Sequence, residues 1–195
     1  MSISKDTWII SDTHINHRNI LKFVDHYTGE LIRPGFDNIE QMNEYIVEQW
    51  NAYVKPGDHV IHLGDVTLGP KAGFLPLWKR LNGSKSLIAG NHDDIKFFAK
   101  NELVKKIYIW KVLHDFKMVL SHIPLHKSQL LRGPAGHEHD SDYLENYLLN
   151  VHGHIHQQQS PPGPYRCVCV EHTDYKPVHI EDLVATQKQP ISIKR

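Results

Sequence analysis

Short apolar runs alternate with polar, glycine-containing stretches along the chain, and this pattern predicts a series of strands. Each run is brief and rich in β-branched or other large apolar residues, which is typical of strands that are buried on both faces. The expected strands are residues 7–11, 59–63, 86–89, 147–151 and 165–170, with a hairpin of 107–113 and 116–120 around His114-Asp115.

Helical periodicity is clearest over residues 39–53. Five apolar residues recur there at spacings of three and four: Ile39, Met42, Ile46, Trp50 and Tyr53. Asp37 and Glu40 resemble a capping box at the start of this helix. Further helices are expected at 19–26, 75–81, 95–101 and 181–185, and Pro76 would then lie in the first turn of the 75–81 helix.

The order of these elements predicts an α/β fold. Strands alternate with helices first and hairpin-like strands follow, so some antiparallel pairing is expected. A length of 195 residues suits one buried core, and no linker or internal repeat is evident, so we expect a single domain over residues 1–195. The segment 127–142 is polar and rich in Gly, Pro and His, which indicates a long functional or mobile loop.

Composition narrows the class of protein. The formal net charge is zero, which argues against stable binding of nucleic acid through its phosphates. There is no apolar run of membrane-spanning length, and the first residues lack the layout of a secretory signal. Cys167 and Cys169 stand two positions apart, which suits buried thiols better than a disulfide. We therefore expect a cytoplasmic protein without a membrane partner.

Histidine is frequent, with 16 copies, and several stand directly after the expected strands beside Asp, Asn or Gly. The segments are Asp12-Thr13-His14, Gly64-Asp65, Gly90-Asn91-His92-Asp93, Ser121-His122 and Gly153-His154-Ile155-His156. Ligands of α/β sheets gather beyond the carboxyl ends of strands, so these side chains are expected to converge. Carboxylate, imidazole and amide oxygen together suit ions such as Mn²⁺, Fe²⁺ and Zn²⁺. Seven such ligands exceed the needs of one tetrahedral ion and suit two ions roughly 3.5–4 Å apart.

Taken in order, these motifs resemble the calcineurin-like metallophosphoesterase superfamily. The neighbouring residues Ser11 to His14 with His17, Trp50-Asn51 and Leu63 to Asp65 are similar to a small bacterial and phage branch of it. The resemblance covers about residues 12–156. It implies a two-sheet α/β sandwich with flanking helices, and a dinuclear metal centre at the strand ends.

The resemblance also implies a role for each residue of the motifs. The first ion would be bound by Asp12, His14, Asp65 and His156, and the second by Asp65, Asn91, His122 and His154. Asp65 would bridge the two ions, and His92 would be the catalytic histidine beside the leaving group. Some members orient this histidine with an Asp shortly after the Gly-Asp element, but Val66-Thr67 offers no equivalent here. The role of Asp93 stays open.

These roles predict a hydrolase of phosphoesters. A hydroxide held between two ions would attack phosphorus in line. His92 would assist the leaving oxygen, a contribution typically worth ~10²–10⁴-fold. The expected substrates are nucleotide-type phosphodiesters or other small phosphoesters, and the expected cofactor is two manganese ions, with iron, zinc or nickel as alternatives. A phosphomonoesterase, a non-catalytic metal-binding scaffold of the same fold and a DNA-processing nuclease are the alternative functions, and the oligomeric state is left open.

Three further residues are candidates for contact with the substrate, each beside a plainer interpretation. His17 lies three residues after His14 and is equally consistent with a structural histidine. The guanidinium of Arg33 suits bidentate contact with phosphate, although a solvated loop arginine is the commoner case. His126 could line the pocket. His59, His62 and His152 are expected to support the structure rather than to bind ligand.

Overall fold

Among the described residues, five strands form the first sheet, and predicted metal ligands follow three of them. The computed structural model describes residues 6–131 and 147–187. The strands of this sheet are β1 (Thr7–Ile10), β2 (His59–His62), β3 (Ser84–Ile88), β4 (Ile107–Tyr108) and β9 (Val178–His179). Their order is β4-β3-β2-β1-β9, with β1 to β4 parallel and β9 antiparallel to β1. The carboxyl ends of β1, β2 and β3 therefore lie along one edge of the sheet.

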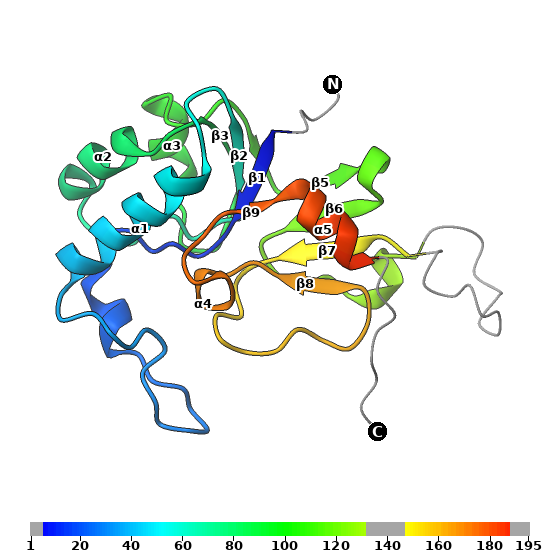
Figure 1. Cartoon of the computed structure of the whole chain (residues 1–195), viewed down its shortest axis with the longest axis horizontal. Helices are drawn as coiled ribbons and strands as arrows, with labels where there is room; N and C mark the ends of the chain where they lie inside the picture. Colours follow the sequence, from blue (N-terminus) through cyan, green and yellow to red (C-terminus); the bar gives the residue numbers. More distant parts are fainter. Residues whose placement is uncertain (1–5, 132–146, 188–195) are drawn as a thin grey trace.

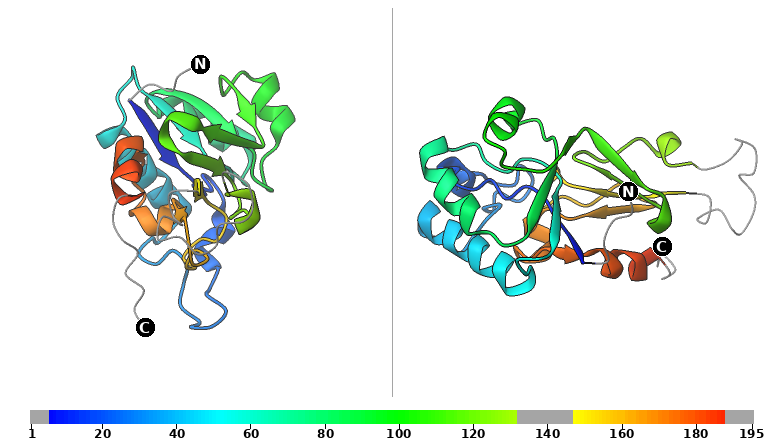
Figure 2. Two further views of the ribbon diagram at one scale, coloured as in Figure 1. Left: turned by 90° about the vertical axis from the view of Figure 1, so that its right-hand side faces the viewer. Right: turned by 90° about the horizontal axis from the view of Figure 1, so that it is seen from above.

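Four strands form the second sheet, in the order β5-β6-β7-β8. They are β5 (Trp110–Leu113), β6 (Met118–Ser121), β7 (Leu149–His152) and β8 (Tyr165–Cys167). Here β5 is antiparallel to β6, while β6, β7 and β8 run parallel. The two sheets are seen one against the other in Figures 1 and 2.

Successive side chains of each strand point to opposite faces of the first sheet, and one apolar layer lies on each face. Ile9 and Ile61 share a buried cluster with Leu120 and Val151 of the second sheet, so this layer fills the space between the sheets. Val60 and its neighbours on the other face pack against helices. The expected sandwich is confirmed, and period-two alternation explains why each strand is buried on both sides.

Three helices cover the outer face of the first sheet (Figure 2). They are α1 (Ile39–Tyr53), α2 (Lys71–Arg80) and α3 (Ile95–Lys100). Large side chains on their inner faces bury against the sheet, among them Trp50, Phe74, Trp78 and Phe98. Within the described residues, two helices follow β8, the short α4 (Val170–Thr173) and α5 (Ile180–Gln187). The same part of the chain holds the 3₁₀ turns η1 (Arg18–Lys22), η2 (His114–Phe116) and η3 (Lys127–Gln129).

The helix predicted over 39–53 is confirmed residue for residue, but its cap is not the predicted one. Asn38 is the N-cap, and its side chain accepts a hydrogen bond from the Gln41 amide. The Gln41 side chain accepts in turn from the Asp37 amide. The N-cap thus lies one residue later than in the predicted pairing of Asp37 with Glu40, because Asn is as good a cap as Asp.

Two other helix predictions were wrong in extent. The segment 19–26 holds only the 3₁₀ turn η1, because the chain then turns back on itself: Val24 bridges Leu31, and the Asp25 carboxylate accepts from two amides of the turn. The helix expected at 75–81 begins earlier, at Lys71, so Pro76 lies inside α2. Burial of aromatic residues on the inner face of α2 outweighs the backbone bond that Pro76 cannot make.

The predicted strand 107–113 belongs to two sheets. Residues 107–108 form β4 and residues 110–113 form β5, which pairs with β6 as expected. The loop expected at 127–142 lies outside the described residues beyond Leu131. Cys167 and Cys169 are both buried and free, as predicted. Within residues 6–131 and 147–187, no helix has the length and apolarity that crossing a bilayer would need.

Candidate metal centre

The predicted ligands follow five strands whose carboxyl ends meet where the two sheets join. Ser11 makes a parallel bridge to Cys169, which ties the end of β1 to the segment after β8. The Gly153 amide donates to the carbonyl of His122, which ties the ends of β6 and β7. This joint brings residues that are more than a hundred positions apart into one cluster, as the strand-end argument predicted.

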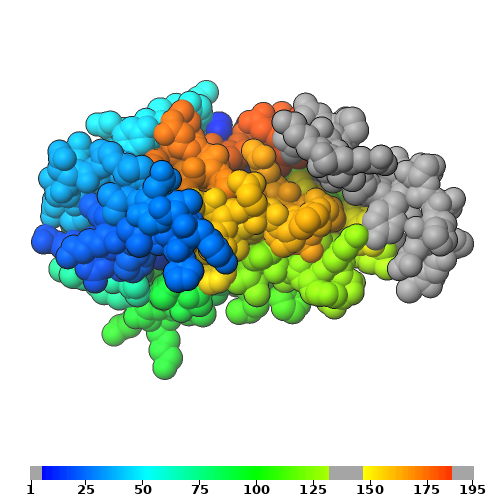
Figure 3. All heavy atoms as spheres, turned by 90° about the horizontal axis from the view of Figure 1, so that it is seen from below, coloured from blue at the N-terminus to red at the C-terminus, as the bar shows by residue number. Residues whose placement is uncertain are grey.

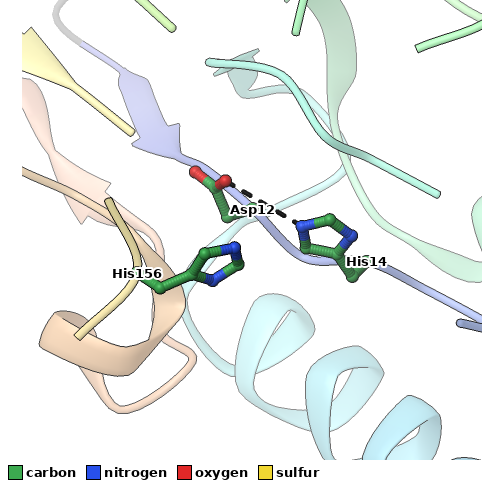
Figure 4. A group of neighbouring side chains, drawn as sticks. All are labelled: Asp12, His14 and His156. Carbon is green, nitrogen blue, oxygen red and sulfur yellow. Dashed lines mark ion pairs between the residues drawn. The ribbon is translucent and has the colours of Figure 1, made fainter. Parts of the chain in front are cut away.

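Two groups of ligand atoms lie within this cluster. In each, the ligand atoms lie within 4.8 Å of one another: Asp12, His14 and His156 form one group, and Asp65, His122 and His154 form the other. Figure 4 shows the first group, with Asp12 and His14 on the segment after β1 and His156 facing them from a separate segment. The residues assigned to each ion by resemblance therefore stand together.

Asp65, a member of the second group, also faces the first. Its Oδ2 is 3.7 Å from His14 Nε2, and its Oδ1 is 3.6 Å from His122 Nε2. Both separations are too long for hydrogen bonds but suit two atoms that each lie roughly 2.1 Å from a shared ion. Each carboxylate oxygen thus faces a different group, which is the geometry of a bridging ligand.

Asn91 completes the second group. Its Oδ1 lies 2.9 Å from His122 Nε2, and His154 Nδ1 lies 3.2 Å from the same nitrogen. His122 Nδ1 is 2.8 Å from the carbonyl oxygen of Leu63. A carbonyl can only accept, so Nδ1 carries the proton and the lone pair of Nε2 faces Asp65 and Asn91.

Unpartnered buried atoms test whether these residues fit a metal ion. Asp12 Oδ1 and both ring nitrogens of His14 are buried without a hydrogen-bond partner in the described part of the chain. His14 Nε2 lies 4.0 Å from Asp12 Oδ1, and Figure 4 marks this pair. Leaving such atoms unsatisfied costs about 1–3 kcal/mol each. A divalent cation between Asp12 Oδ1 and His14 Nε2 would satisfy these two atoms, and the donor set of carboxylate, imidazole and amide oxygen suits one.

The other oxygen of Asp12 is firmly held. Oδ2 accepts from Ser11 Oγ at 2.6 Å, from the His154 amide at 2.8 Å and from Cys169 Sγ at 3.2 Å. These bonds leave Oδ1 to face His14. Burial raises the pKa of Asp12 to about 6, against the charges of His122 and His156. Burial, and then the charge of Arg33, lowers the pKa of His14 far below its ordinary value, so its ring is neutral as a ligand must be.

The backbone at the centre is close-packed and strained. A Cβ on Gly90 would collide with Asp65, and one on Gly153 with Ser11 and Asp12. Of the seven predicted ligands, five adopt left-handed backbone conformations: Asp12 (φ 58°), His14 (48°), Asp65 (56°), His154 (70°) and His156 (49°). Such conformations cost of order 1–3 kcal/mol each and gather at functional sites.

The comparisons with known proteins agree with this geometry. A model of the calcineurin-like phosphoesterase family matches residues 6–113, more than half of the 195-residue chain. The chain belongs to the calcineurin-like phosphoesterase family. The match includes Asp12, His14, Asp65 and Asn91, whereas the histidines after β6 and β7 lie beyond it and join the site through the fold.

Two relatives extend the similarity over nearly the whole chain. An uncharacterized protein, MJ1445, of Methanocaldococcus jannaschii is 32% identical over 194 residues, which cover 94% of this chain and 92% of that protein. A crystal structure of a protein of unknown function, AQ665, from Aquifex aeolicus aligns with a TM-score of 0.61 at 27% identity and covers 92% of this chain and 98% of that one. Neither name states an activity, so the family gives the class of chemistry and the site must give the rest.

In this member of the calcineurin-like phosphoesterases, His92 lies on the open side of the centre. Its side chain is 44% exposed, and its Nε2 lies 4.0 Å from Asp65 Oδ2. Its amide donates to Asp65 Oδ1 at 3.0 Å, and its ring centre is 6.0 Å from that of His14. The imidazole can therefore be reached by a substrate that touches the ligand cluster. Its role in catalysis stays a prediction.

Asp93, whose role the sequence left open, holds two backbone loops together. Its carboxylate accepts from the amides of Asp65 and Gly90 at 2.9 Å each and from that of Val66 at 3.0 Å. It thus clamps the loop after β2 to the loop after β3. Burial raises the pKa of Asp93, while these backbone bonds lower it in part. The clamp fixes Asp65 and Asn91 relative to each other.

The three candidate substrate contacts have different surroundings. His17 is buried, its ring centre is 5.5 Å from that of His14, and its Nδ1 has no partner in the described part of the chain. Arg33 is also buried, which corrects the expectation of a solvated loop arginine; its donors bond to Glu171 and to the carbonyls of Asp12 and Thr13. His126 is exposed, and its Nδ1 bonds to Ser128 within its own turn.

His62 and His152 support the structure, as predicted. His62 is fully buried beside Trp50 and Trp78, bonds to Thr13 Oγ1 at 3.0 Å and accepts from the Gly64 amide. His152 is buried and bonds to Ser160. Both lie just behind the ligand loops and hold them in place.

Sequence reasoning missed Glu171. This buried residue in α4 bonds through Oε1 to His156 Nδ1 at 2.8 Å and to Arg33 Nε at 2.8 Å. Burial would raise the pKa of Glu171, but the charges of Arg33 and His156 outweigh it and lower the pKa to about 2. Burial by itself would lower the pKa of His156, but the hydrogen bond to Glu171 and its charge outweigh burial, so the pKa of His156 is raised. No local spacing marks the group, because Arg33 and Glu171 are 138 positions apart.

Proposed function

We propose that this protein is a phosphoester hydrolase that depends on two divalent metal ions. The observation that carries the proposal is Asp65, whose two oxygens face His14 of one ligand group and His122 of the other at 3.7 and 3.6 Å. Bound there, two cations would supply an activated water and offset the charge of the phosphate oxygens. Manganese is the proposed metal, with iron, zinc or nickel as alternatives, because imidazole and carboxylate serve all four.

The chain itself would contribute the proton to the leaving oxygen. His92 is half-exposed beside Asp65, so its imidazole would lie next to a phosphate held at the centre. Protonation of the leaving oxygen by such a group is typically worth ~10²–10⁴-fold. Backbone amides and the Asp93 clamp keep the loop of His92 in place, so that this proton is delivered at a fixed position.

The proposed substrates are small phosphodiesters of nucleotide type or related esters with an organic group on each side of the phosphate. Residues 23–32 form an arm beside the centre that carries half-exposed apolar side chains, and the ring of Phe23 lies 5.7 Å from that of His17. Gln157 donates to Asp25 and ties this arm to the loop of His154 and His156. In Figure 3 the arm and this loop lie against each other. An apolar arm at this place supports contact with the organic group of an ester.

Metal analysis and a substrate screen test the proposal. The protein is stripped with a chelator and titrated with each metal, and hydrolysis of bis-p-nitrophenyl phosphate is compared with that of p-nitrophenyl phosphate. We expect about two manganese ions per chain and a higher kcat/KM for the diester. A higher value for the monoester would indicate the phosphomonoesterase alternative.

Other results would contradict the proposal. Two bound ions with no turnover of any ester would indicate a non-catalytic scaffold, and no bound ion would refute the dinuclear centre. Cleavage of single- or double-stranded DNA in preference to small esters would indicate the nuclease alternative.

The free, buried thiols of Cys167 and Cys169 support a reducing compartment such as the cytoplasm.

A further inference from the structure

One carboxylate oxygen joins His156 to Arg33. Glu171 Oε1 lies 2.8 Å from His156 Nδ1 and 2.8 Å from Arg33 Nε, and the side chains of Arg33 and Glu171 are 0% and 4% exposed. A carboxylate ion can only accept, so the proton of the neutral imidazole must be on Nδ1. The lone pair of His156 is then on Nε2, the nitrogen that remains free for an ion. Glu171 thus decides which nitrogen His156 can offer.

The other end of Arg33 reaches the segment after β1. Arg33 NH1 donates to the carbonyl of Thr13 at 3.0 Å, and NH2 donates to the carbonyl of Asp12. These two carbonyls belong to the short backbone segment that joins Asp12 to His14, and both of those residues have left-handed backbone conformations. A single buried pair, Arg33 and Glu171, therefore fixes all three members of the first ligand group relative to one another.

The second ligand group has a different support. There the backbone carbonyl of Leu63 accepts from His122 Nδ1 at 2.8 Å. It fixes the tautomer of His122 as Glu171 fixes that of His156. Side chains that orient ligating histidines in this way typically contribute 10–100-fold to metal affinity. Because the two groups rely on separate partners, removing Glu171 should weaken one ion and leave the other unchanged.

We infer that Glu171 and Arg33 are positioning residues for the first metal ion: Glu171 sets the tautomer of His156, and Arg33 holds the Asp12–His14 segment against the same carboxylate. The inference rests on the proposed two-metal function, since it needs an ion between these residues. It adds to the site two residues that lie outside the ligand motifs, one of them near the C-terminal end of the described chain.

Glu171→Ala and Glu171→Gln test this inference, and Glu40→Ala is the matched control. Glu40 also pairs with an arginine, Arg18, at 3.0 Å, but the two side chains are 65% and 76% exposed. Manganese titration of the full chain should show two ions in the wild type and in Glu40→Ala. In Glu171→Ala one ion should bind about 10–100-fold more weakly. Glu171→Gln keeps an acceptor oxygen for Nδ1 and should restore part of that affinity.

A second readout needs no metal. Nitrogen NMR of the stripped protein, at a pH where the imidazole is neutral, should show His156 protonated at Nδ1 in the wild type and in Glu171→Gln. In Glu171→Ala it should show the Nε2-protonated form that an unrestrained imidazole prefers. If Glu171→Ala does not fold, the wild-type tautomer and the affinity of Glu171→Gln decide: an Nε2-protonated His156 in the wild type overturns the inference.

The possible failures are distinguishable. A wild type that binds no metal refutes the proposed function whatever the variants do. A wild type that binds two ions, with Glu171→Ala binding both equally tightly, refutes the inference alone. Equal weakening of both ions, together with a lower melting temperature of the stripped variant, would show a general structural role and would also overturn it.

Discussion

Gly153→Ala is a small substitution that should displace Asp12, a predicted ligand of the metal centre. Gly153 follows β7, and a Cβ there would collide with Ser11 Oγ and Asp12 Oδ2 and would lie 2.8 Å from Ser11 Cβ. The Asp12 carboxylate cannot simply move aside, because Oδ2 is held by Ser11, by the His154 amide and by Cys169. Gly153 does not have a left-handed backbone, so the effect is one of space alone.

The cost follows from overpacking. Inserting a methyl group into a site that cannot yield typically costs about 1–3 kcal/mol. For a chain of this size each kcal/mol lowers the melting temperature by roughly 2–4 °C, so we expect a fall of about 2–12 °C in the metal-free protein. Displacement of Asp12 should also weaken the first ion, and the second ion should be retained.

Gly57→Ala is the matched control for this prediction. Gly57 lies in the turn after α1, nothing lies within 4 Å of an added Cβ, and its backbone is not left-handed. The same substitution should there be neutral or stabilise by up to about 1 kcal/mol. Thermal unfolding and manganese content of the two variants are compared side by side. Equal melting temperatures and two tightly bound ions in both variants would refute the packing argument.

Three further predictions concern the ligands and the buried histidine behind them. Asp65→Asn should weaken both ions in a manganese titration, because its two oxygens face both groups; loss of only one ion would contradict the bridge. His92→Ala should lower kcat by about 10²–10⁴-fold with unchanged metal content, and wild-type turnover of every ester would exclude its role. Burial lowers the pKa of His62 to about 3, so its contribution to stability is full above pH 6.5 and is lost as the pH falls from 6.5 to 3. The loss amounts to about 1.4 kcal/mol per pH unit, or roughly 5 kcal/mol in total. Urea unfolding of His62→Phe between these pH values should show a flatter dependence than the wild type, and parallel curves would contradict the assignment.

The ligand cluster could be predicted from the sequence because its signal is local. Each ligand directly follows an apolar run, and parallel strands deliver such residues to one edge. The helix over 39–53 was predictable for a similar reason, since its periodicity is confined to one element. Gly90 and Gly153 stand beside predicted ligands in the sequence, and an added Cβ would collide with Asp65 at Gly90 and with Asp12 at Gly153.

The remaining features depend on contacts between distant segments. Arg33 reads as a loop arginine until α4 brings Glu171 against it from 138 positions away. Residues 107–113 form one apolar run, and periodicity does not tell that its first half joins one sheet and its second half the other. Pro76 argues against a helix that tertiary burial nevertheless imposes.

The left-handed backbone of the predicted ligands lowers the stability of the fold at the residues on which the proposed function depends. His154 has φ of 70° and an exposed side chain, so glycine at this position would relieve conformational strain at little cost in packing. A selection for heat resistance alone should therefore favour His154→Gly and drive the protein away from metal binding. Directed evolution of a variant with a higher melting temperature would therefore have to include a screen for bound manganese in every round.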